Sequence, residues 1–442
     1  MPCSASPKAP VSLWIIWILI SAVFWRPNNK NYFQLVFYIM IIGIDASRAN
    51  LQHKTGTEWY SFYLIKSLAA IDKKNTYWLY VNRPPVKELR EAIQDNPNFS
   101  FRLLNWPVRY FWTLGRLTLE MLWRRPDVLF IPAHALPLFG PRKTINTIHD
   151  IAFVREQNLY HSWKVRDIRP GSQRLLDLSV KSLTLGKYSS RSVDYLYWST
   201  AFSLRHARKI IAVSEFTRRE ILDFYPHTPK DKIAVVHNGY VRELFRPINE
   251  PEKTQAVLRK YELPDLYFLY VGRLEKKKNV SALVEALAIL RDHHPEIKAK
   301  LVLIGDAGFG FDEIEYSIEE FNLNDEVIMP GWVSEADLPY IFNAASAFIF
   351  PSKHEGFGLP VVQAMACGVP AAVSDLPVLR EIAGEGVLYF NQHDKYAIAT
   401  AMRRIVSEAE LRRRLITKGL ERAKAFSWEK CARETLKEIE TC

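Results

Sequence analysis

The residues best suited to chemistry lie in a loop that follows a predicted strand. Residues 345–350 form an almost wholly apolar run, which is typical of a buried strand in a parallel sheet. The loop beyond it contains Glu355, and Gly356 and Gly358 follow closely. Glycine lets a backbone approach a ligand because it has no Cβ. A carboxylate at the mouth of such a loop could hold the hydroxyl groups of a sugar.

A helix is predicted to begin where this loop ends. Pro360 suits the first turn of a helix, where its missing N–H would have no partner. Residues 361–367 continue the helix, and Gly368 ends it. The free N–H groups and the positive end of such a helix attract anions. Gln363, on the first turns, could hold another pair of hydroxyl groups, so the segment predicts a site for an anion and a sugar.

Glu355, seven intervening residues and then Gln363 resemble the signature of the retaining glycosyltransferases of family 4, which have the GT-B architecture. The resemblance implies that Glu355 contacts the donor sugar and that Gln363 contacts the ribose of the nucleotide. The family has a second Glu at the place of Gln363. An amide still offers a donor and an acceptor, so we expect ribose binding with weaker hydrogen bonds and no role that needs a carboxylate. The loop residues implied to bind the donor are Gly356, Phe357, Gly358 and Leu359.

A second anion site is predicted in a basic loop that follows another apolar run. The loop contains Gly272, Arg273 and Lys278. A guanidinium group offers a planar fork to phosphate oxygens, and an ammonium group offers a compact charge. The family has an Arg and a Lys at this place, which implies that Arg273 and Lys278 stabilise the donor diphosphate. We expect the intervening Lys276 and Lys277 to be solvated.

The resemblance extends to four further positions. His149 and Asp150 stand at the end of the strand predicted at residues 143–149, and ligands of open α/β sheets gather at the carboxyl ends of strands. We expect His149 to bond the acceptor or a sugar hydroxyl, and Asp150 to lie on the acceptor side, where it orients His149 or the loop. Gly56 lies where the family has a Thr-Gly pair near the diphosphate. Val333 lies at the turn that holds the nucleobase largely through its backbone.

Alternating apolar runs and amphipathic segments predict an α/β protein. The resemblance implies the GT-B architecture, in which two Rossmann-like domains with parallel sheets face a central cleft and a C-terminal helix crosses back to the first domain. Ser214 suits a helix cap, and Thr217 and Glu220 have the spacing of a capping box. The predicted divisions are an apolar extension at residues 1–39, an acceptor domain at 40–245, a nucleotide-sugar donor domain at 246–425 and a terminal helix at 426–442.

Two segments raise the question of a membrane. Residues 11–25 are uncharged and almost wholly apolar, but as a helix they would span roughly 22 Å, less than the roughly 30 Å of a hydrocarbon core. They are either an anchor or part of an upstream extension that the working protein lacks, because Met40 directly precedes the first predicted strand. Residues 109–125 predict an amphipathic helix that lies on a lipid surface or packs on its own domain. We expect a cytoplasmic protein, peripheral or anchored at its N-terminus on the cytoplasmic face.

The net charge and the cysteine spacing restrict the classes of partner and ligand that we expect. The net charge is +11, and residues 141–209 contribute 13 Lys and Arg against 5 Asp and Glu. Such a basic segment could meet an anionic membrane surface or phosphate-bearing substrates, or be merely solvated. It carries no nucleic-acid motif, so we expect no nucleic-acid partner. The four cysteines have neither disulfide nor metal-site spacing, which predicts reduced thiols and no metal.

The resemblance implies a retaining glycosyltransferase (hexosyltransferase, EC 2.4) that uses a nucleotide-diphosphate sugar and needs no cofactor. A hexose, with mannose favoured, would pass to a lipid-linked or polysaccharide acceptor. The leaving phosphate would take the acceptor's proton on the same face. The paired carboxylates of a glycosidase are not evident. Three alternatives stay open: a GT-B sugar-nucleotide epimerase, a non-catalytic nucleotide-sugar-binding protein and a membrane scaffold.

Overall fold

Apolar segments of three to six residues form a seven-stranded parallel sheet in the first half of the chain. The computed structural model describes residues 39–106, 112–155 and 192–442. The strand order is β3-β2-β1-β4-β5-β6-β7, and the central strands β4 and β5 are buried along their whole length. The strands are β1 (Ile41–Asp45), β2 (Thr76–Val81), β3 (Phe99–Leu103), β4 (Val128–Ile131), β5 (Thr144–Ile148), β6 (Lys209–Ala212) and β7 (Ile233–Val235). We call this sheet with its helices the first lobe.

Two helices of the first lobe, α2 and α8, begin at polar caps. Thr55 and Glu58 form a capping box at the start of α2, where the Thr55 N–H donates to Glu58 Oε2 at 3.2 Å. Ser214 caps α8 by accepting a hydrogen bond from the N–H of Thr217. The helices are α2 (Gly56–Ile71), α3 (Lys87–Glu91), a π-helical segment η1 (Trp112–Leu117), α4 (Thr118–Trp123), α5 (Ala152–Arg155), α7 (Ser192–His206), α8 (Glu215–Phe224) and the 3₁₀ turn η3 (Lys230–Lys232).

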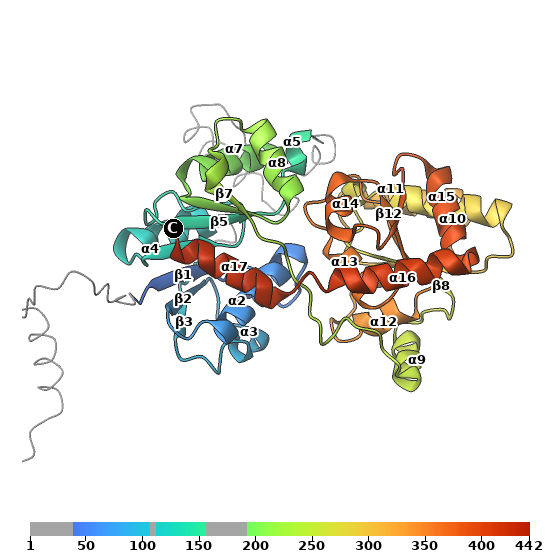
Figure 1. The fold of residues 1–442 in the computed structure, drawn as a ribbon, viewed down its shortest axis with the longest axis horizontal. Coiled ribbons are helices and arrows are strands. Elements are labelled where there is room, and N and C mark those ends of the chain that lie inside the picture. Colours follow the sequence, from blue (N-terminus) through green and yellow to red (C-terminus); the bar gives the residue numbers. More distant parts are fainter. Residues whose placement is uncertain (1–38, 107–111, 156–191) are drawn as a thin grey trace, which may run out of the picture. The chain divides into compact units, whose positions relative to one another are not determined.

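A second parallel sheet, of six strands in the order β10-β9-β8-β11-β12-β13, forms the second lobe. Its strands are β8 (Tyr267–Val271), β9 (Lys300–Ile304), β10 (Val327–Gly331), β11 (Ala347–Phe350), β12 (Ala371–Ser374) and β13 (Leu388–Phe390). Its helices are α9 (Pro251–Lys260), the 3₁₀ turn η4 (Lys276–Lys278), α10 (Val280–His293), α11 (Phe311–Glu320), α12 (Leu338–Ala344), α13 (Leu359–Ala366), α14 (Pro377–Ala383), α15 (Lys395–Ser407) and α16 (Ala409–Ala423). The prediction of an α/β protein with two parallel sheets is confirmed (Figure 1).

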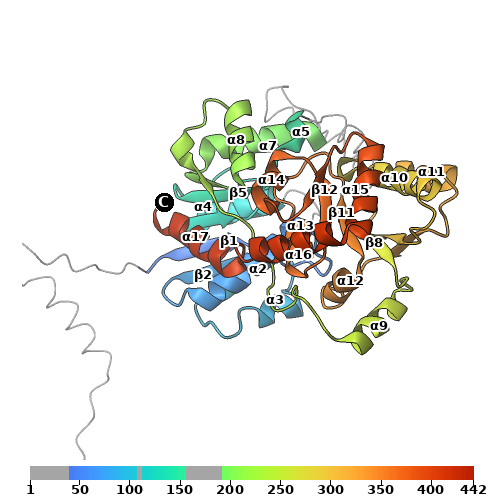
Figure 2. The same cartoon turned by 45° about the vertical axis from the view of Figure 1, so that its right-hand side comes forward.

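The last helix, α17 (Trp428–Glu440), returns to the first lobe. In both ribbon views this red helix lies beside the blue helix α2, with which it is in contact (Figures 1 and 2). Its apolar residues Trp428, Cys431 and Ile439 belong to the same buried cluster as β1 and α2. The predicted helix that crosses back is therefore present, and it ties the end of the chain to the start of the first sheet.

The structure corrects one prediction about a helix start and does not test several others. The capping box predicted at Thr217 and Glu220 is wrong, because both residues lie inside α8 and Ser214 is its N-cap residue. Residues 1–38, 107–111 and 156–191 lie outside the described residues, so the apolar segment at 11–25 and much of the basic segment are not placed. The boundaries at 245/246 and 425/426 stay predictions. Within the described ranges, no helix combines the length and apolar character needed to cross a membrane.

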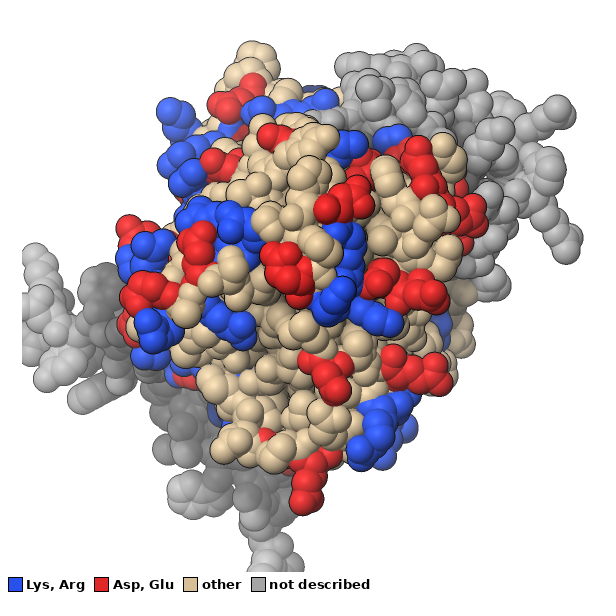
Figure 3. All heavy atoms as spheres, turned by 90° about the vertical axis from the view of Figure 1, so that its right-hand side faces the viewer, with Lys and Arg blue, Asp and Glu red and all other residues tan. Residues whose placement is uncertain are grey.

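Charges on the surface of the second lobe are mixed. Figure 3 shows basic and acidic side chains interspersed over one face, without a large region of a single sign. Pairs such as Arg404 with Glu408, and Arg413 with Glu410, are examples of such neighbours. Of the cysteines, Cys367 and Cys431 are buried free thiols and Cys442 is partly exposed.

Candidate active site

A cavity of about 460 Å³ lies at the carboxyl ends of strands from both lobes. The first lobe contributes the loops that follow β1, β5 and β7, and the second lobe contributes the loops that follow β8, β9, β10 and β11. This is the edge at which open α/β sheets bind ligands. Every residue predicted for the site lines this cavity: Gly56, His149, Asp150, Gly272, Arg273, Lys278, Val333, Glu355, Gly356, Phe357, Gly358, Leu359 and Gln363.

Glu355 is held by two partners at the mouth of β11. Lys278 Nζ lies 2.6 Å from Glu355 Oε1, and Ser352 Oγ donates to the same oxygen at 2.7 Å. Both charged side chains are largely buried, with 16% of Lys278 and 9% of Glu355 exposed. A buried pair of opposite charges compensates the desolvation of each member. Lys278 is thus a cation kept inside the cavity, and Glu355 is a carboxylate fixed beside it.

Arg273 lies on the neighbouring loop with more freedom. Its side chain is 40% exposed, and its Nε lies 3.9 Å from Glu275 Oε2. The backbone before it is tightly packed, because a Cβ on Gly305 would come within 1.9 Å of the Gly272 carbonyl oxygen. Gly272 itself has a φ of +155°. These glycines therefore let the ends of β8 and β9 approach each other. The half-exposed Arg273 side chain lines the cavity, where it can reach an anion.

His149 is fixed as a neutral ring. Its Nε2 donates to the carbonyl oxygen of Pro132 at 3.1 Å, and its ring meets the Tyr60 ring edge-on at 4.7 Å. Burial, and then the nearby His134, lower the pKa of His149 to about 4. Since Nε2 carries the proton, Nδ1 is left as a hydrogen-bond acceptor. The ring can therefore accept a hydrogen bond from a hydroxyl group at neutral pH.

Asp150 forms an ion pair between the lobes. Lys277 Nζ lies 3.3 Å from Asp150 Oδ2, and only 14% of the Lys277 side chain is exposed. Burial alone would raise the pKa of Asp150, but Lys277, then His354 and His134, hold it well below its usual range. The expectation that Lys277 is solvated is therefore wrong. Lys276 pairs with Glu313, and a third of its side chain is exposed.

The geometry of the 3₁₀ turn η4 explains why three adjacent lysines have separate partners. Three residues per turn send successive side chains in three directions. Lys276 turns to Glu313, Lys277 to Asp150 of the first lobe and Lys278 to Glu355. Sequence reasoning missed Lys277 because a run of lysines is most often a solvated face. The one signal that could have revealed the role of Lys277 is that the three lysines form a short helical turn beside the predicted phosphate site.

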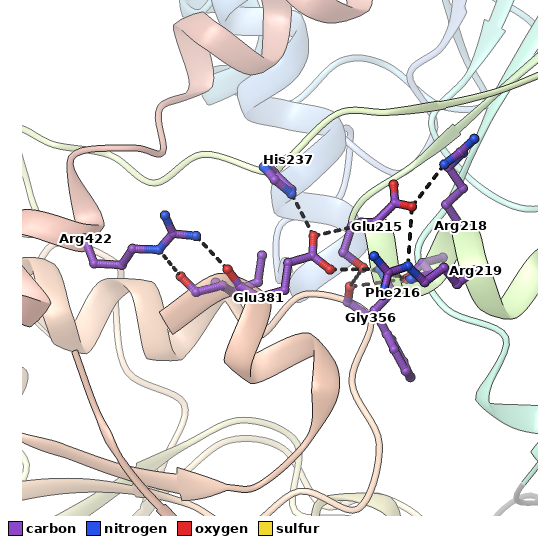
Figure 4. Close-up of polar contacts among 11 residues, drawn as sticks. Glu215, Phe216, Arg218, Arg219, His237, Gly356, Glu381 and Arg422 are labelled. Carbon is purple, nitrogen blue, oxygen red and sulfur yellow. Dashed lines mark hydrogen bonds and ion pairs between the residues drawn. The ribbon is translucent and has the colours of Figure 1, made fainter. Parts of the chain in front are cut away.

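Gly356 brings the two lobes into direct contact. A Cβ at this position would lie 1.7 Å from the carbonyl oxygen of His149. The Gly356 carbonyl oxygen accepts hydrogen bonds from Ser214 Oγ at 2.7 Å and Thr217 Oγ1 at 3.3 Å. Figure 4 shows Gly356 beside the start of α8. The glycine is thus required for packing between the lobes as well as available to a ligand. Gly358, the N-cap of α13, has a φ of +87°, which favours glycine.

Aromatic rings that sequence reasoning did not assign also line the cavity. Tyr63 is stacked between Trp59 and Trp428, at 5.3 and 5.6 Å between ring centroids. The Tyr63 hydroxyl donates to Glu335 across the lobes, and burial raises the pKa of Glu335. These residues line the cavity together with Val333. The signal in the sequence was the spacing of Trp59 and Tyr63 on one helical face.

Comparison with known proteins gives the family. The model described as "Glycosyltransferase Family 4" matches residues 54–243, and the model described as "Glycosyl transferases group 1" matches residues 253–422. The chain is 33% identical over 245 residues to the O-antigen chain mannosyltransferase B of Escherichia coli. That match takes in 55% of this chain and 63% of the relative, so it spans less than two thirds of the relative's length.

Solved structures share the fold. Sucrose-phosphate synthase from Thermosynechococcus elongatus matches with a TM-score of 0.68 and 21% identity, over 91% of this chain and 98% of that one. The Anabaena protein HepE, in complex with UDP and glucose, matches with a TM-score of 0.63 and 15% identity, over 92% and 100%. The two family matches together take in most of the chain, one for each lobe. The chain belongs to family 4 of the glycosyltransferases and has the GT-B fold.

Proposed function

We propose that this chain is a retaining glycosyltransferase. It moves a hexose from a nucleotide-diphosphate sugar to a lipid-linked or polysaccharide acceptor in glycan biosynthesis. The single observation that carries the proposal is the convergence of Arg273, Lys278, Glu355 and His149 on one cavity between the lobes. In this proposal the second lobe holds the donor, the acceptor enters from the first lobe, and the reaction occurs on the cytoplasmic side of a membrane.

The donor half of the reaction needs positive charge beside the leaving diphosphate. Breaking the sugar–phosphate bond places negative charge on the phosphate oxygens, and preorganised donors in a dry site stabilise that charge strongly. Lys278 and Arg273 provide two cations at neighbouring strand ends. The backbone N–H groups from Gly356 to Gly358 lie at the start of α13, where its positive end adds to them. These groups supply the charge compensation, so the proposal needs no metal.

The sugar and the acceptor would lie between Glu355 and the end of β5. Glu355, anchored by Lys278 and Ser352, would bind hydroxyl groups of the donor sugar. His149 Nδ1 would accept a hydrogen bond from a hydroxyl of the sugar or the acceptor. The proton of the attacking hydroxyl passes to the leaving phosphate on the same face, because the new bond forms as the old one breaks. Asp150, neutralised by Lys277, would orient this loop.

Mannose is the favoured hexose because the relative from Escherichia coli is named as a mannosyltransferase. HepE, which was solved with UDP and glucose, supports a nucleotide sugar as the donor class. Gln363 lines the cavity on α13, where its amide could bind the ribose. Donor turnover separates this proposal from a protein that binds nucleotide sugars without catalysis. Release of a sugar epimer without transfer would indicate an epimerase.

A membrane surface is a further part of the proposal. The described part of the amphipathic segment exposes Leu119, Leu122 and Trp123, with 48%, 46% and 85% of each residue accessible. Arg124 and Arg125 follow directly. Exposed apolar residues beside basic ones fit an anionic lipid interface. We expect the protein to sediment with vesicles that contain an anionic lipid, and Trp123→Ala to reduce that binding.

Thermal stabilisation of the full chain tests the proposal. The melting temperature is measured with GDP-mannose, UDP-glucose, UDP-galactose, UDP-N-acetylglucosamine and the bare nucleoside diphosphates. A ligand that binds the folded state raises the melting temperature as its concentration exceeds the dissociation constant. We expect a rise with one base in preference to the others. A folded sample that responds to none of these nucleotides would contradict the proposed function.

A further inference from the structure

Helix α8 of the first lobe contains a buried carboxylate that the proposed reaction does not use. Glu220 is 1% exposed, and its Oε2 accepts a hydrogen bond from Nε2 of His354 at 3.0 Å. His354 belongs to the second lobe and is 5% exposed. Neither side chain lines the cavity. The pair therefore joins the lobes through the interior rather than by touching a ligand.

The surroundings of the pair show that it has one defined arrangement. Arg155 Nε lies 2.9 Å from the other oxygen of Glu220, Oε1, and supplies a compensating charge. Nδ1 of His354 is buried and has no hydrogen-bond partner among the described residues. The bond to Glu220 is therefore what orients the imidazole ring. Removing the carboxylate would leave a buried donor unsatisfied, which costs more than the bond itself contributes.

His354 directly precedes Glu355, the residue proposed to bind the donor sugar. Gly356, directly after Glu355, is also held by α8, through Ser214 Oγ at 2.7 Å. The first lobe thus fixes the chain on both sides of Glu355, while the Glu355 side chain faces Lys278 and the cavity. Figure 4 shows the Gly356 side of this contact and the start of α8.

We propose that Glu220 and His354 are positioning residues that hold Glu355 in register with the donor sugar when the lobes are engaged. This inference rests on the proposed function. The pair makes the hydrogen bonds between Glu355 and the sugar depend on the position of the first lobe. A donor bound only to the second lobe would therefore lack a correctly placed Glu355. The contact acts on the sugar and leaves the nucleotide end of the cavity unchanged.

A comparison of two ligands separates positioning from simple stability. Dissociation constants for a nucleotide sugar and for its bare nucleoside diphosphate are measured by calorimetry, together with kcat and KM for transfer. For Glu220→Ala we expect kcat/KM to fall by about 10- to 100-fold, since a small misplacement of a binding group costs that much. The nucleoside diphosphate should bind as it does to the wild-type protein, while the nucleotide sugar loses affinity.

Conservative and double variants complete the test. Glu220→Gln keeps an oxygen that can accept the His354 bond, so it should recover most of the loss. The double variant Glu220→Ala with His354→Ala should lose no more than the worse single variant, because the two residues act as one unit. Glu326→Gln is the matched control, since its ion pair with Arg291 does not line the cavity, and it should leave both affinities unchanged.

The possible results exclude one another. Equal loss of affinity for both ligands in Glu220→Ala would overturn the inference and indicate a general effect on the fold. Wild-type kinetics in the same variant would also overturn it. If the wild-type protein binds neither ligand, the proposed function itself fails, which is a separate result from failure of the positioning pair.

Discussion

Single side chains in the cavity are preorganised by opposite charges rather than left free. Lys278 and Glu355 neutralise each other at 2.6 Å, and Lys277 and Asp150 do so at 3.3 Å. Both pairs are largely buried, so neither charge depends on solvent for its compensation. A bound diphosphate could share Lys278 with Glu355, which would leave the carboxylate available to sugar hydroxyls.

Removing either proposed phosphate-binding cation should slow transfer. Arg273→Ala and Lys278→Ala should each reduce turnover by roughly 100-fold or more, since each removes a donor aimed at developing charge. Steady-state kinetics with the donor identified by thermal stabilisation measures the effect. Lys276→Ala is the control from the same turn, because Lys276 pairs with Glu313 and does not line the cavity. Wild-type rates in both test variants would show that the diphosphate lies elsewhere.

The buried, neutral state of His149 should make the free energy of unfolding depend on pH in the acid range. Its pKa is about 4 in the folded protein and about 6.5 in an unfolded chain. Between these values the unfolded state binds more protons, so the free energy of unfolding falls as the pH drops from 6.5 to 4. His149→Asn should lose less stability than the wild-type protein over this range in urea titrations. An equal loss in both proteins would show that His149 is not buried in its neutral form.

At the level of elements, the sequence located the two strands that precede the site loops to within two residues, at 345–350 for β11 and at 143–149 for β5. Buried parallel strands are near-continuous apolar runs, so their short length and the turn residues that bound them are enough to find them. The contacts between the lobes could not be predicted from the sequence, because the partners are far apart in the chain. Glu220 pairs with His354, and Asp150 pairs with Lys277. Helix starts were only partly predicted. The Thr-x-x-Glu pattern occurs at Thr55 and at Thr217, but α8 already begins after Ser214, so only the pattern at Thr55 stands at a helix start.

Helix α8 receives a cap from the opposite lobe, and removing it should weaken the protein. The Glu381 carboxylate accepts hydrogen bonds from the N–H groups of Glu215 and Phe216 at 2.7 and 2.8 Å, and from His237 Nε2 at 2.9 Å (Figure 4). An anion at a helix N-terminus is stabilising. We expect Glu381→Gln to lower the free energy of unfolding by about 1–2 kcal/mol at pH 7.

The same carboxylate predicts a pH dependence. Burial alone would raise the pKa of Glu381, but the bonds from His237, Glu215 and Phe216 lower it overall. Its contribution is therefore complete above the ordinary glutamate pKa of about 4.3, and it is lost as the pH falls through the lower, folded value. The stability difference between wild type and Glu381→Gln should vanish in acid. Glu385→Gln, which removes an exposed pair with Lys418, should have little effect at any pH.

On the scale of the whole molecule, the start of α17 packs tightly against the first lobe, both on α2 and on the segment that follows β7. Trp428 packs on Tyr60 and Tyr63 of α2, with ring centroids 5.9 and 5.6 Å away. Gly239, just after β7, lies against the backbone of residues 427 and 428. The chain leaves the second lobe after α16 and reaches the first lobe at the start of α17. The contact of residues 427 and 428 with Gly239 therefore fixes where the chain returns to the first lobe.

Gly239→Ala should therefore destabilise the protein more than an ordinary surface change. A Cβ at this position would lie 2.0 Å from the backbone nitrogen of Trp428, and backbone cannot turn aside as a flexible side chain can. Overpacking of this kind costs about 1–3 kcal/mol, and more where backbone must move, so we expect a loss of about 3 kcal/mol in urea unfolding. Gly56→Ala is the matched control, because a Cβ there meets nothing within 4 Å, and its stability should equal that of the wild type. If Gly239→Ala unfolds at the same urea concentration as Gly56→Ala, then α17 can shift on the first lobe at little cost, and the return of the chain does not fix how the lobes engage.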